Sequence, residues 1–113
     1  MAIPDWTVHE ALDALREGSI SSVELTEEVI GRVEALDDQI KAYLTFAPDA
    51  ARGQAEVADR RRAQGEEAPL LGVPLAIKDV LCTKDMPTTC GSKILQGYRS
   101  PYDATVVAKL RQA

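Results

Sequence analysis

The sequence feature that most constrains the fold is a nearly unbroken apolar run, Leu70 to Ile77, which follows a polar linker at 65–69. Such a run is typical of a β-strand buried on both faces of a parallel or mixed sheet, and Pro74 should lie at its start because proline cannot donate a ladder hydrogen bond. A strand of this kind needs neighbouring strands and covering helices. The chain has one other, weaker strand candidate, residues 42–46, which fits an extended connector equally well. We therefore expect the N-terminal portion of a longer α/β protein.

The residues before this run predict three helices. Apolar side chains recur at helical spacing in 8–17 and 22–36, and each segment begins with the spacing of a capping box. Asp37 and Asp38 should end the second helix because short acidic side chains compete for backbone donors. Segment 48–64 is rich in helix formers, although its mostly alanine face buries little surface. The capping boxes pair Thr7 with Glu10 and Ser21 with Glu24, and Gly18 suits the left-handed position after the first helix.

The residues after the apolar run predict two short helical pieces. One turn is expected within 91–95, and Asp103 is expected to cap a final helix that carries Val106, Val107 and Leu110. That helix has no Gly, Asn or Pro stop signal, which again indicates a longer protein. We divide the chain into an N-terminal helical segment at 1–66 and the start of an α/β core at 67–113. The predicted fold class is α/β, here mainly helical with one buried core strand.

Composition excludes several classes of protein. The formal net charge of −5 disfavours free-standing nucleic-acid binding, and no apolar run approaches the ~20 residues of a membrane span. Cys82 and Cys90 are too few for a disulfide scaffold, and no export segment is apparent, so we expect two reduced, buried thiols in the cytoplasm. Their spacing is not that of a zinc site, and neither a P-loop nor a GxGxxG motif is present. We therefore predict no metal and no cofactor in this chain.

Lys78 is the first candidate for catalysis. It follows the apolar run and precedes Asp79, so it can lie in a site of low dielectric constant, where desolvation lowers the pKa of an amine and makes it a general base. The alternative is a solvated lysine, or one paired with a carboxylate.

The other residues that stand out have structural interpretations. Thr88, Thr89 and Ser92 can contact a substrate or orient Lys78, but turn formation and helix capping by these hydroxyls is the preferred interpretation. His9 is expected to be a half-exposed helix residue, and Trp6 is expected to pack at the N-terminus. The arginines at 60–62 are expected to complement the dipole of the third helix, and the alternative is that they contact tRNA.

The apolar run with its lysine, 70–79, resembles the lysine-bearing segment of the amidase signature family. Three further stretches, 81–84, 87–95 and 101–107, resemble one branch of that family, the glutaminase subunits of the tRNA-dependent amidotransferases, and 21–26 resembles the start of their second helix. The likeness covers nearly the whole chain. It implies an amidase-signature fold, with a mixed sheet between helices, of which this chain would supply the entry helices and the first core strand.

The resemblance also implies a mechanism. Family members use a serine, a bridging cis-serine and a neutral lysine, and Lys78 aligns with that lysine. Both serines belong to a Gly- and Ser-rich segment that is absent here, so the chain alone should be inactive. Val80 is a smaller departure, since Asn is frequent after the Asp in this branch.

The partners implied are the substrate glutamine, subunits B and C of the amidotransferase, and misacylated tRNA, which is bound mainly by the B subunit. ATP and Mg would be used by the complex through that same partner, and no membrane is involved. The product would be the ammonia that converts Glu-tRNA(Gln) or Asp-tRNA(Asn) to the amidated form. Two alternatives stay open, another amidase-signature hydrolase and a non-catalytic helical interaction module.

Overall fold

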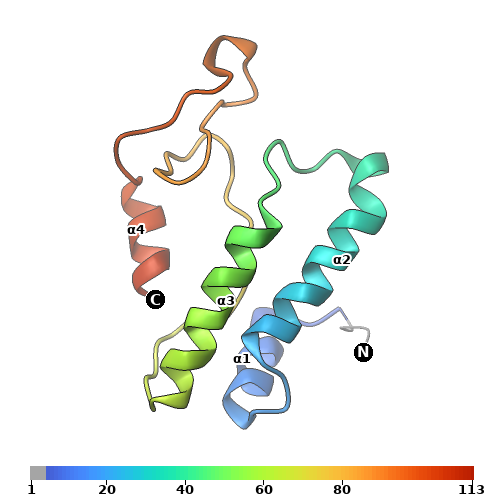
Figure 1. Ribbon diagram of the computed structural model, residues 1–113, viewed down its shortest axis with the longest axis vertical. Coiled ribbons are helices and arrows are strands. Elements are labelled where there is room, and N and C mark those ends of the chain that lie inside the picture. The colour runs from blue at the N-terminus through green and yellow to red at the C-terminus, as the bar shows by residue number, and fades with distance from the viewer. Residues whose placement is uncertain (1–4) are drawn as a thin grey trace. The chain divides into compact units, whose positions relative to one another are not determined.

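The computed structural model describes residues 5–113. Its elements are three α-helices, α1 (Val8–Glu17), α2 (Ser22–Ile40) and α3 (Pro48–Ala63), then the 3₁₀ turn η1 (Lys93–Leu95) and the helix α4 (Thr105–Gln112) (Figure 1). The chain forms two compact units, which are described separately below. Among the described residues, the first unit contains 5–42 and 47–74, and the second contains 43–46 and 75–113. No helix within 5–113 combines the length and apolar character needed to cross a membrane.

The predicted capping boxes of the first unit are confirmed. The hydroxyl of Thr7 accepts a hydrogen bond from the Glu10 amide, and the Glu10 carboxylate accepts one from the Thr7 amide in return. Ser21 and Glu24 form the same reciprocal pair at the start of α2. Gly18 ends α1 with φ 74°, a left-handed conformation that favours glycine. These local signals are why both helices begin where the sequence predicts.

Helices α2 and α3 run side by side in opposite directions (Figure 1). Asp59 on α3 ties them together, because its two carboxylate oxygens accept hydrogen bonds from the amides of Ser22 (2.7 Å) and Val23 (3.0 Å) at the first turn of α2. A carboxylate suits this position because the amides at a helix N-terminus have no partner within the helix and carry partial positive charge. The start of α2 therefore depends on a residue of α3.

The core of the first unit lies where α1 meets the start of α2. Leu15 is completely buried, and Trp6 and Val73 pack against the cluster of which it is part. The packing role predicted for Trp6 is thereby confirmed. Besides Leu15, the buried members of the cluster are Ala11, Ala14, Ile20 and Leu25.

The predicted end of α2 is wrong. The helix continues past Asp37 and Asp38 to Ile40, and Lys41 then adopts a left-handed conformation with φ 58°. The Asp37 carboxylate does accept a backbone hydrogen bond, from the amide of Ala42 at 2.7 Å. This amide lies beyond the helix, so the short acidic side chain stabilises the turn after α2 without displacing any bond inside it.

The structure does not confirm a buried core strand at 70–77. Leu70 and Leu71 lie in turns, Gly72 has φ 90°, and residues 73–78 have no regular secondary structure and no partner strand among the described residues. Leu71 is buried, whereas the side chain of Leu75 is 46% exposed. An extended segment becomes a strand only when a neighbouring strand pairs with its amides and carbonyls. The weaker candidate at 42–46 is likewise not a strand. It belongs to the connection between α2 and α3, and it bends at residues 44 and 45.

The second unit is mostly loop, closed by a few long-range hydrogen bonds. An isolated antiparallel bridge joins Pro87 to Arg99, and the predicted turn at 91–95 is confirmed as η1. The final helix, α4, also forms, but Asp103 does not cap it, because its carboxylate accepts from the Lys84 amide at 2.9 Å and lies 3.7 Å from the Arg111 guanidinium.

Candidate functional site

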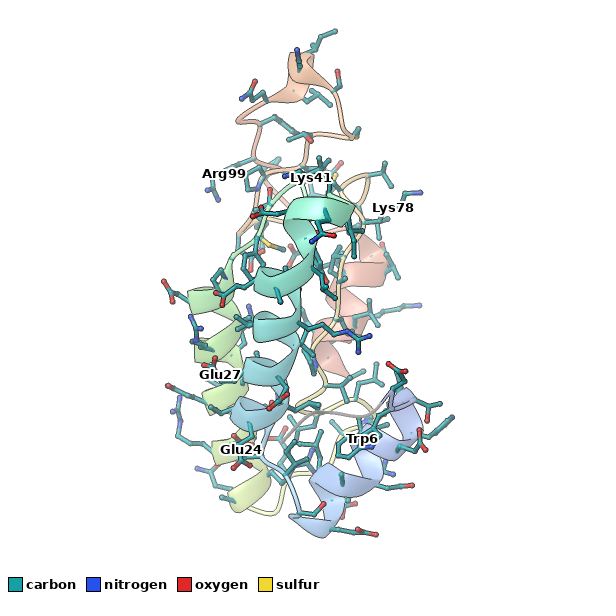
Figure 2. The ribbon with its side chains drawn as sticks, turned by 90° about the vertical axis from the view of Figure 1, so that its right-hand side faces the viewer. Trp6, Glu24, Glu27, Lys41, Lys78 and Arg99 are labelled. Carbon is teal, nitrogen blue, oxygen red and sulfur yellow. The ribbon has the colours of Figure 1, made fainter. Side chains whose placement is uncertain are left out.

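Lys78 lies at the start of a tight turn in the second unit. Its carbonyl accepts a hydrogen bond from the Leu81 amide at 3.0 Å, which closes the turn over residues 78–81. The Lys78 side chain is exposed and projects away from the ribbon (Figure 2). The amine is therefore accessible from solvent in this chain, and the neighbouring backbone is held in a defined conformation.

Asp79 anchors the other side of this turn to the loop at 88–91. One oxygen of the Asp79 carboxylate accepts from the Thr89 amide at 2.8 Å, and the other accepts from the Thr89 hydroxyl. The Asp79 carbonyl also accepts from the Cys90 amide at 3.1 Å. The pKa of the Asp79 carboxyl is lowered, first by the hydrogen bond from the Thr89 hydroxyl and further by the amides of Thr89 and Gly91. Asp79 is therefore an ionised anchor beside Lys78 at neutral pH.

The loop that carries Thr89 is itself supported from within the second unit. Thr88 is buried, its amide donates to the Tyr98 carbonyl at 3.0 Å, and its hydroxyl accepts from the Thr83 amide at 3.3 Å. The adjacent Cys90 and Gly91 both adopt left-handed conformations, with φ 53° and 68°. These contacts give the loop a specific shape, in which the amide and the hydroxyl of Thr89 both reach the same carboxylate.

The three hydroxyl residues after the apolar run thus have different roles. Ser92 caps η1 by accepting from the Ile94 amide at 3.3 Å, which confirms the capping interpretation at that position. Thr88 stabilises the loop, as turn chemistry predicts. Thr89 differs from both, because its hydroxyl donates to the side chain next to Lys78.

All five serines of the sequence are engaged in local structure. Ser21 and Ser92 cap helical segments, and the hydroxyl of Ser22 donates to the Gly72 carbonyl at 2.7 Å. The hydroxyls of Ser19 and Ser100 donate to backbone carbonyls at 3.1 and 2.7 Å. Each serine hydroxyl therefore has a hydrogen-bond partner in the backbone.

The remaining candidates do not contribute to a site. Cys82 and Cys90 are free thiols, but the prediction that both are buried is wrong, because Cys82 is half-buried and Cys90 is exposed. The Cys90 backbone is held in the turn that contacts Asp79. His9 is exposed on α1. Within residues 5–113, no three His, Cys, Asp or Glu side chains are grouped so that they could hold a metal ion.

The arginines at 60–62 lie in the last turn of α3, as the helix-dipole interpretation predicts. Arg61 pairs with Glu66, and the guanidinium of Arg62 donates to the Leu71 carbonyl. Two of the three arginines are therefore occupied by contacts within the first unit.

The sequence model of the family described as "Amidase" matches residues 24–113, which contain the Lys78 turn and its anchoring loop. The chain belongs to the amidase family. A solved structure described as "An unexpected vestigial protein complex reveals the evolutionary origins of an s-triazine catabolic enzyme" superposes with a TM-score of 0.87 at 30% identity, over 94% of this chain and 24% of that one. The fold of this chain therefore recurs within that larger solved structure.

Among curated amidase relatives, the chain is similar to proteins named as the A subunit of glutamyl-tRNA(Gln) amidotransferase. It is 49% identical to that of Geobacter metallireducens and 50% identical to that of Geobacter sulfurreducens, in each case over 113 residues. The protein of Pseudomonas putida is 48% identical over 108 residues. The chain spans 23% of the length of the two Geobacter relatives.

Sequence reasoning identified Lys78 but missed the pairing of Asp79 with Thr89. The two residues are ten positions apart, and no helical or strand periodicity relates them. The only signal in the sequence was the group of hydroxyl residues after the apolar run, which did not indicate which hydroxyl would reach the carboxylate.

Proposed function

We propose that this chain acts as part of the glutaminase subunit of a tRNA-dependent amidotransferase, which hydrolyses glutamine and supplies ammonia for the conversion of Glu-tRNA(Gln) or Asp-tRNA(Asn) to the amidated tRNA. The observation that carries the proposal is the identity of about 50% over the whole chain to the A subunit of glutamyl-tRNA(Gln) amidotransferase. The match to the amidase family over 24–113 supports the same chemistry.

In this proposal Lys78 is the catalytic general base. A neutral lysine takes a proton from a bridging serine, which takes one from the nucleophilic serine as that oxygen attacks the carboxamide carbon of glutamine. The protonated lysine returns its proton through the bridging serine to the leaving nitrogen, so that the tetrahedral oxyanion collapses to an acyl-enzyme and ammonia departs; water then attacks the acyl-enzyme with the same groups as base and acid and releases glutamate. The Lys78 side chain is exposed in this chain. We infer that the remainder of the glutaminase covers it and provides the desolvation that a neutral amine requires.

The other groups that the reaction needs would lie in segments outside this chain. Its serines support local structure, so both catalytic serines would come from elsewhere in the glutaminase, and the chain alone would be inactive. Residues 73–78, which have no regular secondary structure here, would become an inner strand of a mixed sheet between helices. The partners in the cytoplasm would be subunits B and C, the former of which would bind misacylated tRNA and use ATP and Mg.

Another amidase-signature hydrolase is a second candidate, because the fold neighbour is described in connection with an s-triazine catabolic enzyme. It would share Lys78 but would hydrolyse simple amides without any partner protein. The higher identity to the amidotransferase relatives, about 50% against 30%, favours the amidotransferase.

A hybrid glutaminase tests the proposal. In it, this chain replaces the aligned residues of the Geobacter metallireducens relative, and the hybrid is assembled with that organism's partner subunits. We expect glutamine-dependent amidation of Glu-tRNA(Gln), and we expect Lys78→Ala to reduce it by at least about 10³-fold, the scale of losing a residue of a catalytic triad. Amidation with added ammonium should persist in this variant, because that step does not use the glutaminase site.

Lys93→Ala is the matched control, since Lys93 is also an exposed lysine of the second unit. It should retain both activities. Glutaminase turnover that survives Lys78→Ala would contradict the assignment of the base. Rapid turnover of simple amides without partner subunits would favour the second candidate.

A further inference from the structure

We propose that Thr89 is a positioning residue for Lys78, acting through the carboxylate of Asp79. This inference rests on the proposed function, because it assigns a role in the same reaction. It identifies the hydroxyl and amide of one residue as the groups that fix the orientation of the lysine-bearing turn.

Thr89 contacts Asp79 through two hydrogen bonds. Thr89 donates twice to one carboxylate, through its amide to one oxygen at 2.8 Å and through its hydroxyl to the other. Hydrogen bonds to both oxygens fix the rotation of the carboxylate as well as its position, and bonds to an ionised acceptor are the stronger kind. The side chain that follows Lys78 is therefore held rigidly against the loop.

The hydroxyl of Thr89 has a direction that the surrounding loop determines. Its oxygen accepts a hydrogen bond from the Gly91 amide at 3.2 Å. A hydroxyl has one proton to donate, and because the Gly91 amide occupies one of its lone pairs, that proton is directed at Asp79. The left-handed φ of Cys90, 53°, forms part of the bend that brings the Gly91 amide back to Thr89.

The backbone that follows Lys78 is held at two successive carbonyl groups. The Leu81 amide donates to the Lys78 carbonyl at 3.0 Å, and the Cys90 amide donates to the Asp79 carbonyl at 3.1 Å. With the carboxylate of Asp79 also fixed, the peptide groups on both sides of Asp79 have defined orientations. One of these, the peptide group between Lys78 and Asp79, adjoins the Lys78 Cα, so its orientation limits the directions in which the Lys78 side chain can leave the backbone.

Catalysis by a general base depends on this direction. A proton transfer requires the two heavy atoms to be within about 2.6–3.2 Å, and a misplacement of about 1 Å can cost about 100-fold in rate. Loss of the Thr89 hydroxyl would leave the chemistry of Lys78 intact and would loosen its position. The expected effect is therefore on kcat for glutamine hydrolysis, with little effect on KM.

The test compares Thr89→Val, Thr89→Ser and Ser92→Ala in the hybrid glutaminase. Valine keeps the shape of threonine and removes the hydroxyl, whereas serine restores the hydroxyl. We expect Thr89→Val to lower kcat for glutamine hydrolysis by about 10- to 100-fold with KM nearly unchanged, and Thr89→Ser to restore most of it. Ser92→Ala removes a capping hydroxyl of the same loop and should leave kcat unchanged. Ammonia-dependent amidation should be the same in all three variants.

A measurement on the 113-residue chain checks the contact independently of activity. The carboxyl carbon of Asp79 is followed by NMR as a function of pH, and Thr89→Val should raise the pKa of that carboxyl because the hydroxyl that favours the ionised form is lost. Thr89→Ser should leave this pKa low.

The outcomes separate this inference from the proposed function. If Lys78→Ala abolishes glutamine hydrolysis while Thr89→Val matches the unaltered hybrid, the positioning role is wrong and the general base stands. If Thr89→Val lowers ammonia-dependent amidation to the same extent, the residue is merely structural. Full activity of Lys78→Ala would contradict the proposed function itself.

Discussion

Replacing Asp59 by alanine should destabilise the first unit more than most single substitutions on the surface of a helix do. The carboxylate of Asp59 accepts from the amides of Ser22 at 2.7 Å and of Val23 at 3.0 Å. Ser22 is 2% exposed, so water cannot readily replace the lost acceptor. The variant therefore leaves a buried donor unsatisfied at the positive end of α2.

The magnitude follows from the number and kind of bonds lost. A hydrogen bond to a charged group contributes about 1.5–3 kcal/mol, and the lower value applies because Asp59 is only half-buried. Losing both bonds should lower the free energy of unfolding by about 3 kcal/mol. Asp59→Asn keeps one acceptor oxygen and should lose about half as much.

Urea unfolding of the 113-residue chain, followed by far-UV circular dichroism, measures this effect. With a denaturant slope of about 2 kcal/mol per molar urea, Asp59→Ala should move the midpoint down by about 1.5 M. Glu56→Ala is the matched control, because Glu56 is an exposed carboxylate on the same helix, and it should change the free energy of unfolding by less than about 0.5 kcal/mol. Equal shifts for Asp59→Ala and Glu56→Ala would refute the reasoning.

Two further perturbations test other contacts. Gly72→Ala should destabilise the chain by about 2 kcal/mol in the same urea assay, because Gly72 has φ 90° and an added Cβ would lie 3.1 Å from the Cβ of Ser22. An unchanged unfolding midpoint would show that the turn relaxes without cost. The hydrogen bond from Arg111 lowers the pKa of Asp85 below its ordinary value of 3.8. The pair should therefore stabilise the second unit fully above the unfolded pKa and lose this effect as the pH falls through the lower folded pKa. Arg111→Gln should remove that acid-dependent component of stability, and an identical acid profile would contradict the assignment.

The parts of the fold that were predictable from sequence are those set by neighbouring residues. The capping boxes and Gly18 follow from spacings of three residues and one special φ, so the starts of α1 and α2 are correct. The end of α2 was not predictable by the same rule. Asp37 is compatible with a helix interior, and its carboxylate bonds an amide that lies beyond the helix.

The features that the sequence did not predict depend on distant partners. An apolar run such as 70–77 has the composition of a buried strand, but pairing requires a second strand that a local pattern cannot supply. Asp103 is of a residue type that often caps helices, but its carboxylate instead accepts a hydrogen bond from the Lys84 amide, nineteen positions away. In the candidate site, Lys78 was predictable from its place after the apolar run and from the family resemblance. The contact between Asp79 and Thr89 was not predictable, because it depends on how the loop at 88–91 folds.

The contact between α3 and the first turn of α2 has a consequence for how the chain folds. α1 carries its own capping groups at both ends and can form from local interactions alone. The amides of Ser22 and Val23, in the first turn of α2, donate to the carboxylate of Asp59, which lies 37 and 36 positions further along the chain. A loop of that length must therefore close before these two hydrogen bonds can form. These amides should exchange with deuterated solvent only when the two helices separate, which makes the helical pair a single cooperative folding unit.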